Sequence, residues 1–267
     1  MPIQFNSKPG LKPGLVIYLT AGDPDIATTR NIALAAIDAG VEVLELGVPF
    51  SDPLADGPVI QRASERALAK GTSLRDVLTL AAELRVLRPS AGLVIFSYFN
   101  PVLKLGLGRF CALAANCGVD GVLITDMIVE EAGEYLEEMH HTGLKPVFLA
   151  APTSTDQRLK MIAGVSDGFI YAISRVGITG TQQNLATDAG KLVERLRRFT
   201  SLPIAVGFGI STAEHVAAVG EFADAAVIGS AIVALIEKSQ PGTEPAAVSA
   251  FLRGLRQPTS PVLQAQS

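Results

Sequence analysis

Residues 44–57 read LELGVPFSDPLADG. The first letters end an apolar strand that we expect over residues 41–46, and the rest is rich in the Gly, Pro and Asp of turns. Glu45 lies between two leucines at the end of this strand, and Asp56 follows in the turn. A poorly solvated carboxyl group keeps its proton to higher pH, which suits acid–base catalysis. The other interpretation of Glu45 is a strand-end side chain in solvent or in a salt bridge.

The same alternation of strand, turn and helix continues on both sides of this stretch. We expect strands over residues 15–20, 41–46, 93–98, 121–124, 145–149, 168–173, 203–206 and 223–228. We expect helices over residues 26–39, 59–70, 74–87, 109–116, 130–141, 156–163, 187–198, 212–219, 230–238 and 245–255, and a disordered tail over residues 256–267.

This pattern predicts an α/β fold, a (β/α)8 TIM barrel that forms one domain over residues 1–267, with its core at about residues 15–238. An open, doubly wound sheet is the alternative. That fold would carry a glycine-rich dinucleotide motif after its first strand, where this chain reads AGDP at residues 21–24.

The composition indicates a large core with a modest charged surface. The 267 residues are 48% hydrophobic and 18% charged, with a net charge of −4. There is no basic run of the kind that binds nucleic acid, and no apolar run reaches the roughly 20 residues that cross a bilayer. Residues 1–14 contain no signal-peptide core. We therefore expect a cytoplasmic protein with neither a nucleic-acid nor a membrane partner, and with Cys111 and Cys117 as reduced thiols.

Polar residues that follow strands are the candidates for chemistry, because the loops at the carboxyl ends of barrel strands hold the active site. Besides Glu45 and Asp56, these are Thr20, Asp23, Asn100, Asp126 and residues 174–175. Lys145 precedes a strand and belongs to the opposite face. No lysine ends a strand, which argues against a Schiff-base aldolase, and the three histidines are expected in solvent.

Three late loops predict an anion site. They read SRVGITG at residues 174–180, GFGIS at residues 207–211 and GSAI at residues 229–232. Glycine lets backbone N–H groups approach a phosphate, and the start of a helix adds unpaired N–H groups and a favourable dipole. Barrels commonly hold phosphate at this position, so we expect a small phosphorylated substrate.

The run at residues 44–57, its continuation GPVIQRAS at residues 57–64 and the three loops resemble the tryptophan synthase alpha subunit family over about residues 15–238. The resemblance implies a lyase that splits indole-3-glycerol phosphate into indole and glyceraldehyde 3-phosphate. It implies that Glu45 is the general acid–base group and that Asp56 meets the indole nitrogen. It also implies phosphate contacts at Gly180, Gly209, Gly229 and Ser230, and pocket or loop positions at Tyr18, Tyr98, Leu123, Thr125, Tyr171 and Thr179.

The resemblance further implies no metal or organic cofactor in this chain. Pyridoxal phosphate is expected only in a partner beta subunit, which receives indole within an alpha2–beta2 heterotetramer. Two departures bear on that partnership. Residues 1–14 leave little room for the helix that usually covers the barrel bottom, and Ile128 stands where the family usually has proline.

Three alternatives stay open. The first is a free-standing indole-glycerol-phosphate lyase, and the second is a non-catalytic barrel that binds a phosphorylated ligand and regulates a partner. The third, a sugar-phosphate isomerase, shares only the expected fold.

Overall fold

The computed structural model describes residues 3, 5, 13–173, 182–207 and 209–256. Within these residues nine parallel strands form one sheet in the order β5-β4-β3-β2-β1-β9-β8-β7-β6. The strands are β1 Gly14–Thr20, β2 Val43–Gly47, β3 Gly92–Ser97, β4 Gly121–Ile124, β5 Lys145–Val147, β6 Leu149–Ala150, β7 Ile170–Ile173, β8 Ile204–Gly207 and β9 Ala225–Ile228.

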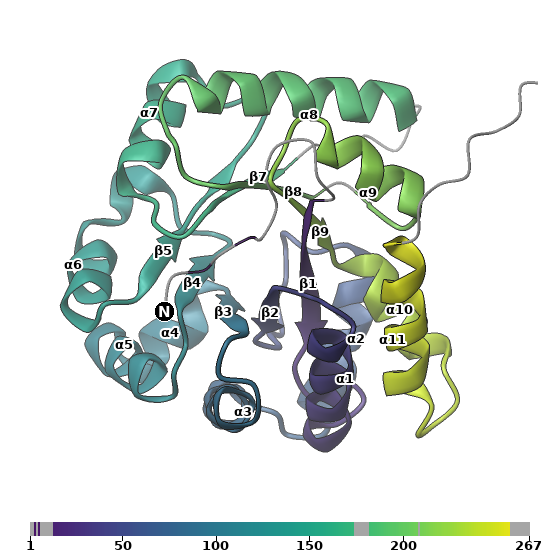
Figure 1. Cartoon of the computed structure of the whole chain (residues 1–267). Helices are drawn as coiled ribbons and strands as arrows, with labels where there is room; N and C mark the ends of the chain where they lie inside the picture. Colours follow the sequence, from purple (N-terminus) through teal and green to yellow (C-terminus); the bar gives the residue numbers. More distant parts are fainter. Residues whose placement is uncertain (1–2, 4, 6–12, 174–181, 208, 257–267) are drawn as a thin grey trace, which may run out of the picture.

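The two edges of this sheet meet in one stretch of chain. Strands β5 and β6 are separated only by Phe148, so residues 145–150 pair with β4 through one part and with β7 through the other. The sheet therefore closes into a barrel of eight β/α units, and the predicted TIM barrel is confirmed (Figure 1).

Helices follow the strands and surround the barrel (Figure 1). In the described part of the chain they are α1 Ile26–Asp38, α2 Pro58–Ala69, α3 Leu74–Leu87, α4 Phe99–Leu105, α5 Leu107–Asn116, α6 Gly133–Thr142, α7 Asp156–Val165, α8 Gln182–Arg197, α9 Ala213–Gly220, α10 Ser230–Lys238 and α11 Glu244–Leu255, with a 3-10 turn η1 at Val129–Glu131. None of these helices combines the length and the apolar character that would let it cross a membrane.

Most predicted elements lie within two residues of the observed ones, with the following exceptions. The strand expected over residues 145–149 is divided, and Pro146 within it has no N–H to donate to a neighbour. Helix α4 was not predicted; it carries Pro101 in its first turn, where a proline is tolerated. Helix α8 begins at Gln182 rather than at residue 187. The tail expected to be disordered lies, from residue 257 on, outside the described residues.

Two N-terminal side chains close the bottom of the barrel, where the sequence leaves little room for a helix. Ile3 is 5% exposed and belongs to the interior cluster formed by inward-facing strand residues. Phe5 packs edge-on against Phe169, with ring centroids 5.8 Å apart. Gly14 leaves room for the Phe5 ring, because a Cβ atom at this position would lie only 2.6 Å from it. In the described part of the chain, Ile3 and Phe5 therefore fill this end of the barrel interior.

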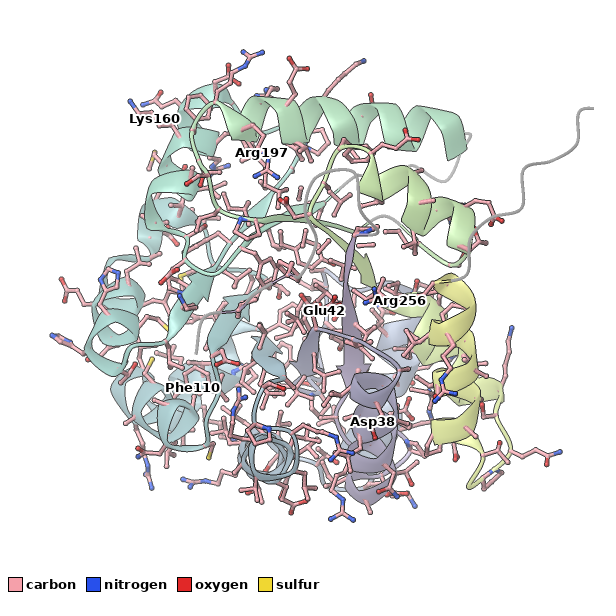
Figure 2. All side chains as sticks on the ribbon, viewed as in Figure 1. Asp38, Glu42, Phe110, Lys160, Arg197 and Arg256 are labelled. Atoms are coloured by element: carbon pink, nitrogen blue, oxygen red, sulfur yellow. The ribbon has the colours of Figure 1, made fainter. Side chains whose placement is uncertain are left out.

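The C-terminal helix is fixed near the same end. One carboxylate oxygen of Glu42 accepts hydrogen bonds from the Leu15 N–H and from Arg256, both at 2.8 Å. Arg256 also donates to the Gly40 carbonyl at 2.5 Å. Figure 2 shows Glu42 and Arg256 beside each other next to β1. These hydrogen bonds hold the end of α11 against the residues that precede β2, and the helix also packs along α1.

Replacing Phe5 by alanine is expected to lower the free energy of unfolding by about 2 kcal/mol, because it removes an aromatic ring from the barrel bottom. Urea unfolding measures the change. Val86→Ala is the control, since that side chain is 79% exposed and should change stability by less than about 0.5 kcal/mol. Equal stability of Phe5→Ala and the wild type would show that this segment does not close the barrel.

Candidate active site

Glu45 points into the barrel. Successive side chains of a strand face opposite sides, and Val43 belongs to the interior cluster, whereas Leu44 and Leu46 belong to the cluster between strands and helices. Glu45 therefore shares the inward face with Val43. It is fully buried, and neither carboxyl oxygen has a hydrogen-bond partner within the described residues.

Burial raises the pKa of Glu45 from its ordinary value of 4.5 to about 8. The sequence indicates a raised value, but the flanking leucines are not its cause, since both point away from the carboxyl group. The desolvation comes instead from the barrel interior. A carboxyl group of this kind is protonated at neutral pH and can both give and recover a proton.

Asp56 lies in the loop between β2 and α2 and is held by Tyr98. The Tyr98 hydroxyl donates to Asp56 Oδ2 at 3.0 Å and accepts from the Ala55 N–H at 2.9 Å. The side-chain amide of Gln61 donates to the Asp56 carbonyl at 2.9 Å. Burial raises the pKa of Asp56, while the hydrogen bond from Tyr98 lowers it. The loop thus presents a second, partly buried carboxylate in a polar environment, unlike the apolar surroundings of Glu45.

Two tyrosines, the buried Tyr18 and the half-buried Tyr171, lie within the electrostatic reach of these carboxylates. Burial raises the pKa of Tyr18 on β1 and of Tyr171 on β7, and the charges of Asp56 and Glu45 raise both further. Both phenols therefore stay protonated at any working pH. Each ring requires a glycine beside it, since a Cβ atom at Gly47 would collide with the Tyr18 hydroxyl and one at Gly207 would lie 2.6 Å from the Tyr171 hydroxyl.

The remaining pocket positions lie on β4 and just after it. Leu123 is fully buried in the interior cluster, and Thr125 is half-buried with its hydroxyl 3.4 Å from the Ser97 carbonyl. Thr125 and Leu149 also line a cavity of about 220 Å³ that extends outward between the loops after β4 and β6. Ile128, on the wall of this cavity, is 44% exposed.

The described part of the predicted anion site lies just after β8 and β9. Gly209 is exposed with φ +63°, a left-handed conformation that favours glycine. Gly229 precedes α10, and Ser230 begins that helix and is exposed. The first N–H groups of α10 are therefore directed toward the loop side, as an anion site requires. Gly180 and Thr179 lie outside the described residues.

Two aspartates that follow strands have structural partners. Asp23 is 3% exposed and accepts two hydrogen bonds of 2.8 Å from Arg66, and Asp126 accepts from the Phe99 N–H at 2.7 Å at the start of α4. Conversely, Phe96 was not predicted to contribute, although its ring lies edge-on to Tyr18 with centroids 5.0 Å apart. The alternation of side chains along β3 could have predicted this position, because it places Phe96 on the inward face with Val94. No group of three or more His, Cys, Asp or Glu side chains in the described residues is placed to hold a metal ion.

Comparison with known proteins places the chain in one family. A sequence profile of the tryptophan synthase alpha chain matches residues 6–257. The tryptophan synthase alpha chain of Solibacter usitatus is 51% identical over 84% of this chain and 84% of that protein. The one from Neisseria meningitidis serogroup B is 46% identical over 91% and 92%.

Solved structures agree with these sequence matches. A Legionella pneumophila alpha chain has a TM-score of 0.84 at 33% identity and covers 92% of this chain and 90% of its own. A chain of the Pyrococcus furiosus tryptophan synthase complex has a TM-score of 0.83 at 38% identity and covers 91% of this chain and 98% of its own.

Proposed function

The chain belongs to the tryptophan synthase alpha chain family, and we propose that Glu45 and Asp56 carry the reaction of that family, the cleavage of indole-3-glycerol phosphate to indole and glyceraldehyde 3-phosphate. The protein is thus a carbon–carbon lyase of tryptophan biosynthesis. The observation that carries the residue assignment is the buried carboxyl group of Glu45, which has no hydrogen-bond partner among the described residues and faces the barrel interior.

The first step uses Glu45 as an acid. With a pKa of about 8 it holds a proton at neutral pH, and it gives this proton to C3 of the indole ring. The ring nitrogen gains positive charge as C3 becomes tetrahedral. Asp56 stabilises that charge when it is ionised and placed near the nitrogen, and the hydrogen bond from Tyr98 favours the ionised form.

The second step uses the same carboxylate as a base. Glu45 takes the proton of the side-chain hydroxyl next to the ring, the carbon–oxygen double bond of the aldehyde forms, and the bond from that carbon to C3 breaks. The bonding electrons return to the ring and neutralise its nitrogen. One proton has moved from the hydroxyl to C3, and Glu45 is protonated again, so the cycle is balanced.

The glycine loops orient the substrate. We assign the phosphate to Gly209, Gly229 and Ser230, together with Gly180, because backbone N–H groups at the start of α10 attract an anion. We assign the indole ring to the surroundings of Tyr98, Leu123 and Thr125. We assign Tyr18 and Tyr171 to the part of the substrate between these two ends, because both lie close enough to Glu45 and Asp56 for the carboxylate charges to raise the pKa of the phenols.

We also propose a beta subunit as partner, in the alpha2–beta2 arrangement implied by the family, with pyridoxal phosphate confined to that subunit. Two large apolar side chains on the active face support a partner: Leu54 is 93% exposed and Ile128 is 44% exposed, in the loops after β2 and β4. We place the assembly in the cytoplasm, since its charged, phosphorylated substrate is retained inside the cell.

Release of indole from indole-3-glycerol phosphate tests the proposal, with the purified chain alone and with a beta subunit added. We expect cleavage by the chain alone and faster cleavage with the partner. Equal turnover with and without the partner would favour the free-standing lyase. Binding of the substrate without any cleavage would favour the non-catalytic barrel.

The pH profile of cleavage is expected to fall on the alkaline side with an apparent pKa near 8. Glu45 must begin the reaction protonated, so kcat/KM decreases as the pH rises through the pKa of that group in the free enzyme. The acid side falls where Asp56 becomes protonated, at a pH above the ordinary value for aspartate. Initial rates between pH 5 and pH 10 measure both limbs. A rate that rises through pH 8 would contradict the acid role of Glu45.

A further inference from the structure

Tyr18 extends along the inward face of the barrel between the anion site and the carboxylates. Its Cα is paired in register with that of Glu45 on the neighbouring strand, and its side chain is 5% exposed. At one end, its Cβ lies 3.6 Å from the position that a Cβ atom would take at Gly229, where α10 begins. At the other end, its hydroxyl occupies the space beside Gly47.

The position of that hydroxyl relative to Glu45 follows from the strand. Gly47 is two residues beyond Glu45 on β2, so both face the barrel interior, with Gly47 nearer the active-face rim. A side chain at Gly47 would collide with the Tyr18 hydroxyl. The phenol oxygen therefore lies one layer above the Glu45 carboxyl group, on the side from which the substrate enters.

The hydroxyl is oriented and has a proton to donate. Thr20 Oγ1 donates to the Tyr18 oxygen at 3.3 Å, and no described residue accepts a hydrogen bond from the phenol itself. Asp56, Glu45 and Tyr98 are the titratable groups that act on it. Burial and these groups raise the pKa of the phenol, so its O–H stays available as a hydrogen-bond donor beside Gly47.

We propose that Tyr18 is a specificity-determining residue, whose hydroxyl donates a hydrogen bond to a hydroxyl of the glycerol side chain of the substrate. The inference rests on the proposed function and extends it. A ligand with its phosphate at α10 and its ring near Asp56 must pass its three-carbon chain beside Tyr18. A buried polar group placed to bind a hydroxyl discriminates strongly against a ligand that lacks one.

The test compares the substrate with indole-3-propanol phosphate, which has the same ring and phosphate but no side-chain hydroxyls. In Tyr18→Phe, kcat/KM for indole-3-glycerol phosphate is expected to fall by about 3- to 10-fold, as for the loss of one hydrogen bond. The inhibition constant of the hydroxyl-free analogue is expected to change by less than about twofold. Thr20→Val should give a smaller change in the same direction, because it removes the group that orients the phenol.

Tyr135→Phe is the matched control. Tyr135 is also a buried phenol, 2% exposed, but its hydroxyl donates to the Val122 carbonyl at 3.0 Å outside the site. Its loss should lower stability without changing the ratio of the two ligands.

Two results would overturn the inference: equal weakening of both ligands by Tyr18→Phe, which indicates packing alone, or no change in either. If the wild type does not cleave the substrate, the proposed function fails separately, and calorimetric binding of the two ligands to wild type and Tyr18→Phe still decides the role of Tyr18.

Discussion

Glu45→Gln is expected to lower kcat for cleavage by at least about 10³-fold, the largest effect of any single substitution in this chain. Glutamine has nearly the shape of the protonated glutamic acid, but it neither gives a proton to the indole carbon nor takes one from the side-chain hydroxyl. Both proton transfers therefore lose their catalyst. Because the phosphate and ring contacts remain, the dissociation constant of indole-3-propanol phosphate should stay within about threefold of the wild type.

A buried carboxyl group elsewhere in the chain provides the control. Glu244 begins α11, is 4% exposed and has one oxygen without a hydrogen-bond partner in the described structure, so it shares the burial of Glu45 but not its place in the barrel interior. Glu244→Gln should leave the rate of indole release unchanged. If Glu45→Gln retained near-normal turnover, Glu45 would have no catalytic role.

The same variant carries an independent signature in stability. The pKa of Glu45 is higher in the folded protein, about 8, than its ordinary value of 4.5. The folded state therefore binds the proton more tightly, and this contribution to stability is complete below pH 4.5 and is lost as the pH rises toward 8. Between pH 5 and pH 8.5 the wild type should lose on the order of 4 kcal/mol more stability than Glu45→Gln. Parallel pH dependences in urea unfolding would mean that Glu45 is not held in its neutral form.

The location of Glu45 could be predicted from the sequence, but the cause of its raised pKa could not. The strand, its end and the following turn are local features, and the repetition of β/α units predicts closure, which places the carboxyl group on the active face. What desolvates it is not local. The residues around Glu45 come from neighbouring strands whose register, such as Tyr18 opposite Glu45, exists only once the barrel has closed.

The misplaced elements have a related origin. Helix α4 carries Pro101 in its first turn, and whether a proline starts a helix or prevents one depends on the residues that cap and bury that turn. The bottom of the barrel was expected to lack a covering helix, and the sequence alone does not indicate that Ile3 and Phe5 fold back into the interior. Asp23 follows a strand as a catalytic residue does, but its partner Arg66 is 43 residues away along the chain. Pairings of this kind depend on the tertiary structure and cannot be read from the local sequence.

Asp56→Asn is expected to lower kcat by about 10²-fold, as removal of one preorganised electrostatic contact with the transition state does. Asparagine keeps the volume of the side chain and an oxygen that accepts from Tyr98, so the loop should retain its conformation. What is lost is the negative charge opposite the indole nitrogen. Because that charge acts most strongly when the nitrogen is positive, KM should change much less than kcat. Steady-state kinetics of indole release measure both.

Two further variants separate the charge of Asp56 from its surroundings. Tyr98→Phe removes the hydrogen bond but leaves the carboxylate, and since that bond lowers the pKa of Asp56, its loss should move the acid limb of the pH profile to higher pH with a smaller loss of kcat. Asp52→Asn removes an exposed carboxylate from the same loop and should leave cleavage by the isolated chain unchanged. If Asp52→Asn and Asp56→Asn reduced kcat equally, the effect would belong to the charge of the loop as a whole. A loss confined to Asp56→Asn requires instead a carboxylate at one position, beside the ring that becomes positive as its carbon accepts the proton from Glu45.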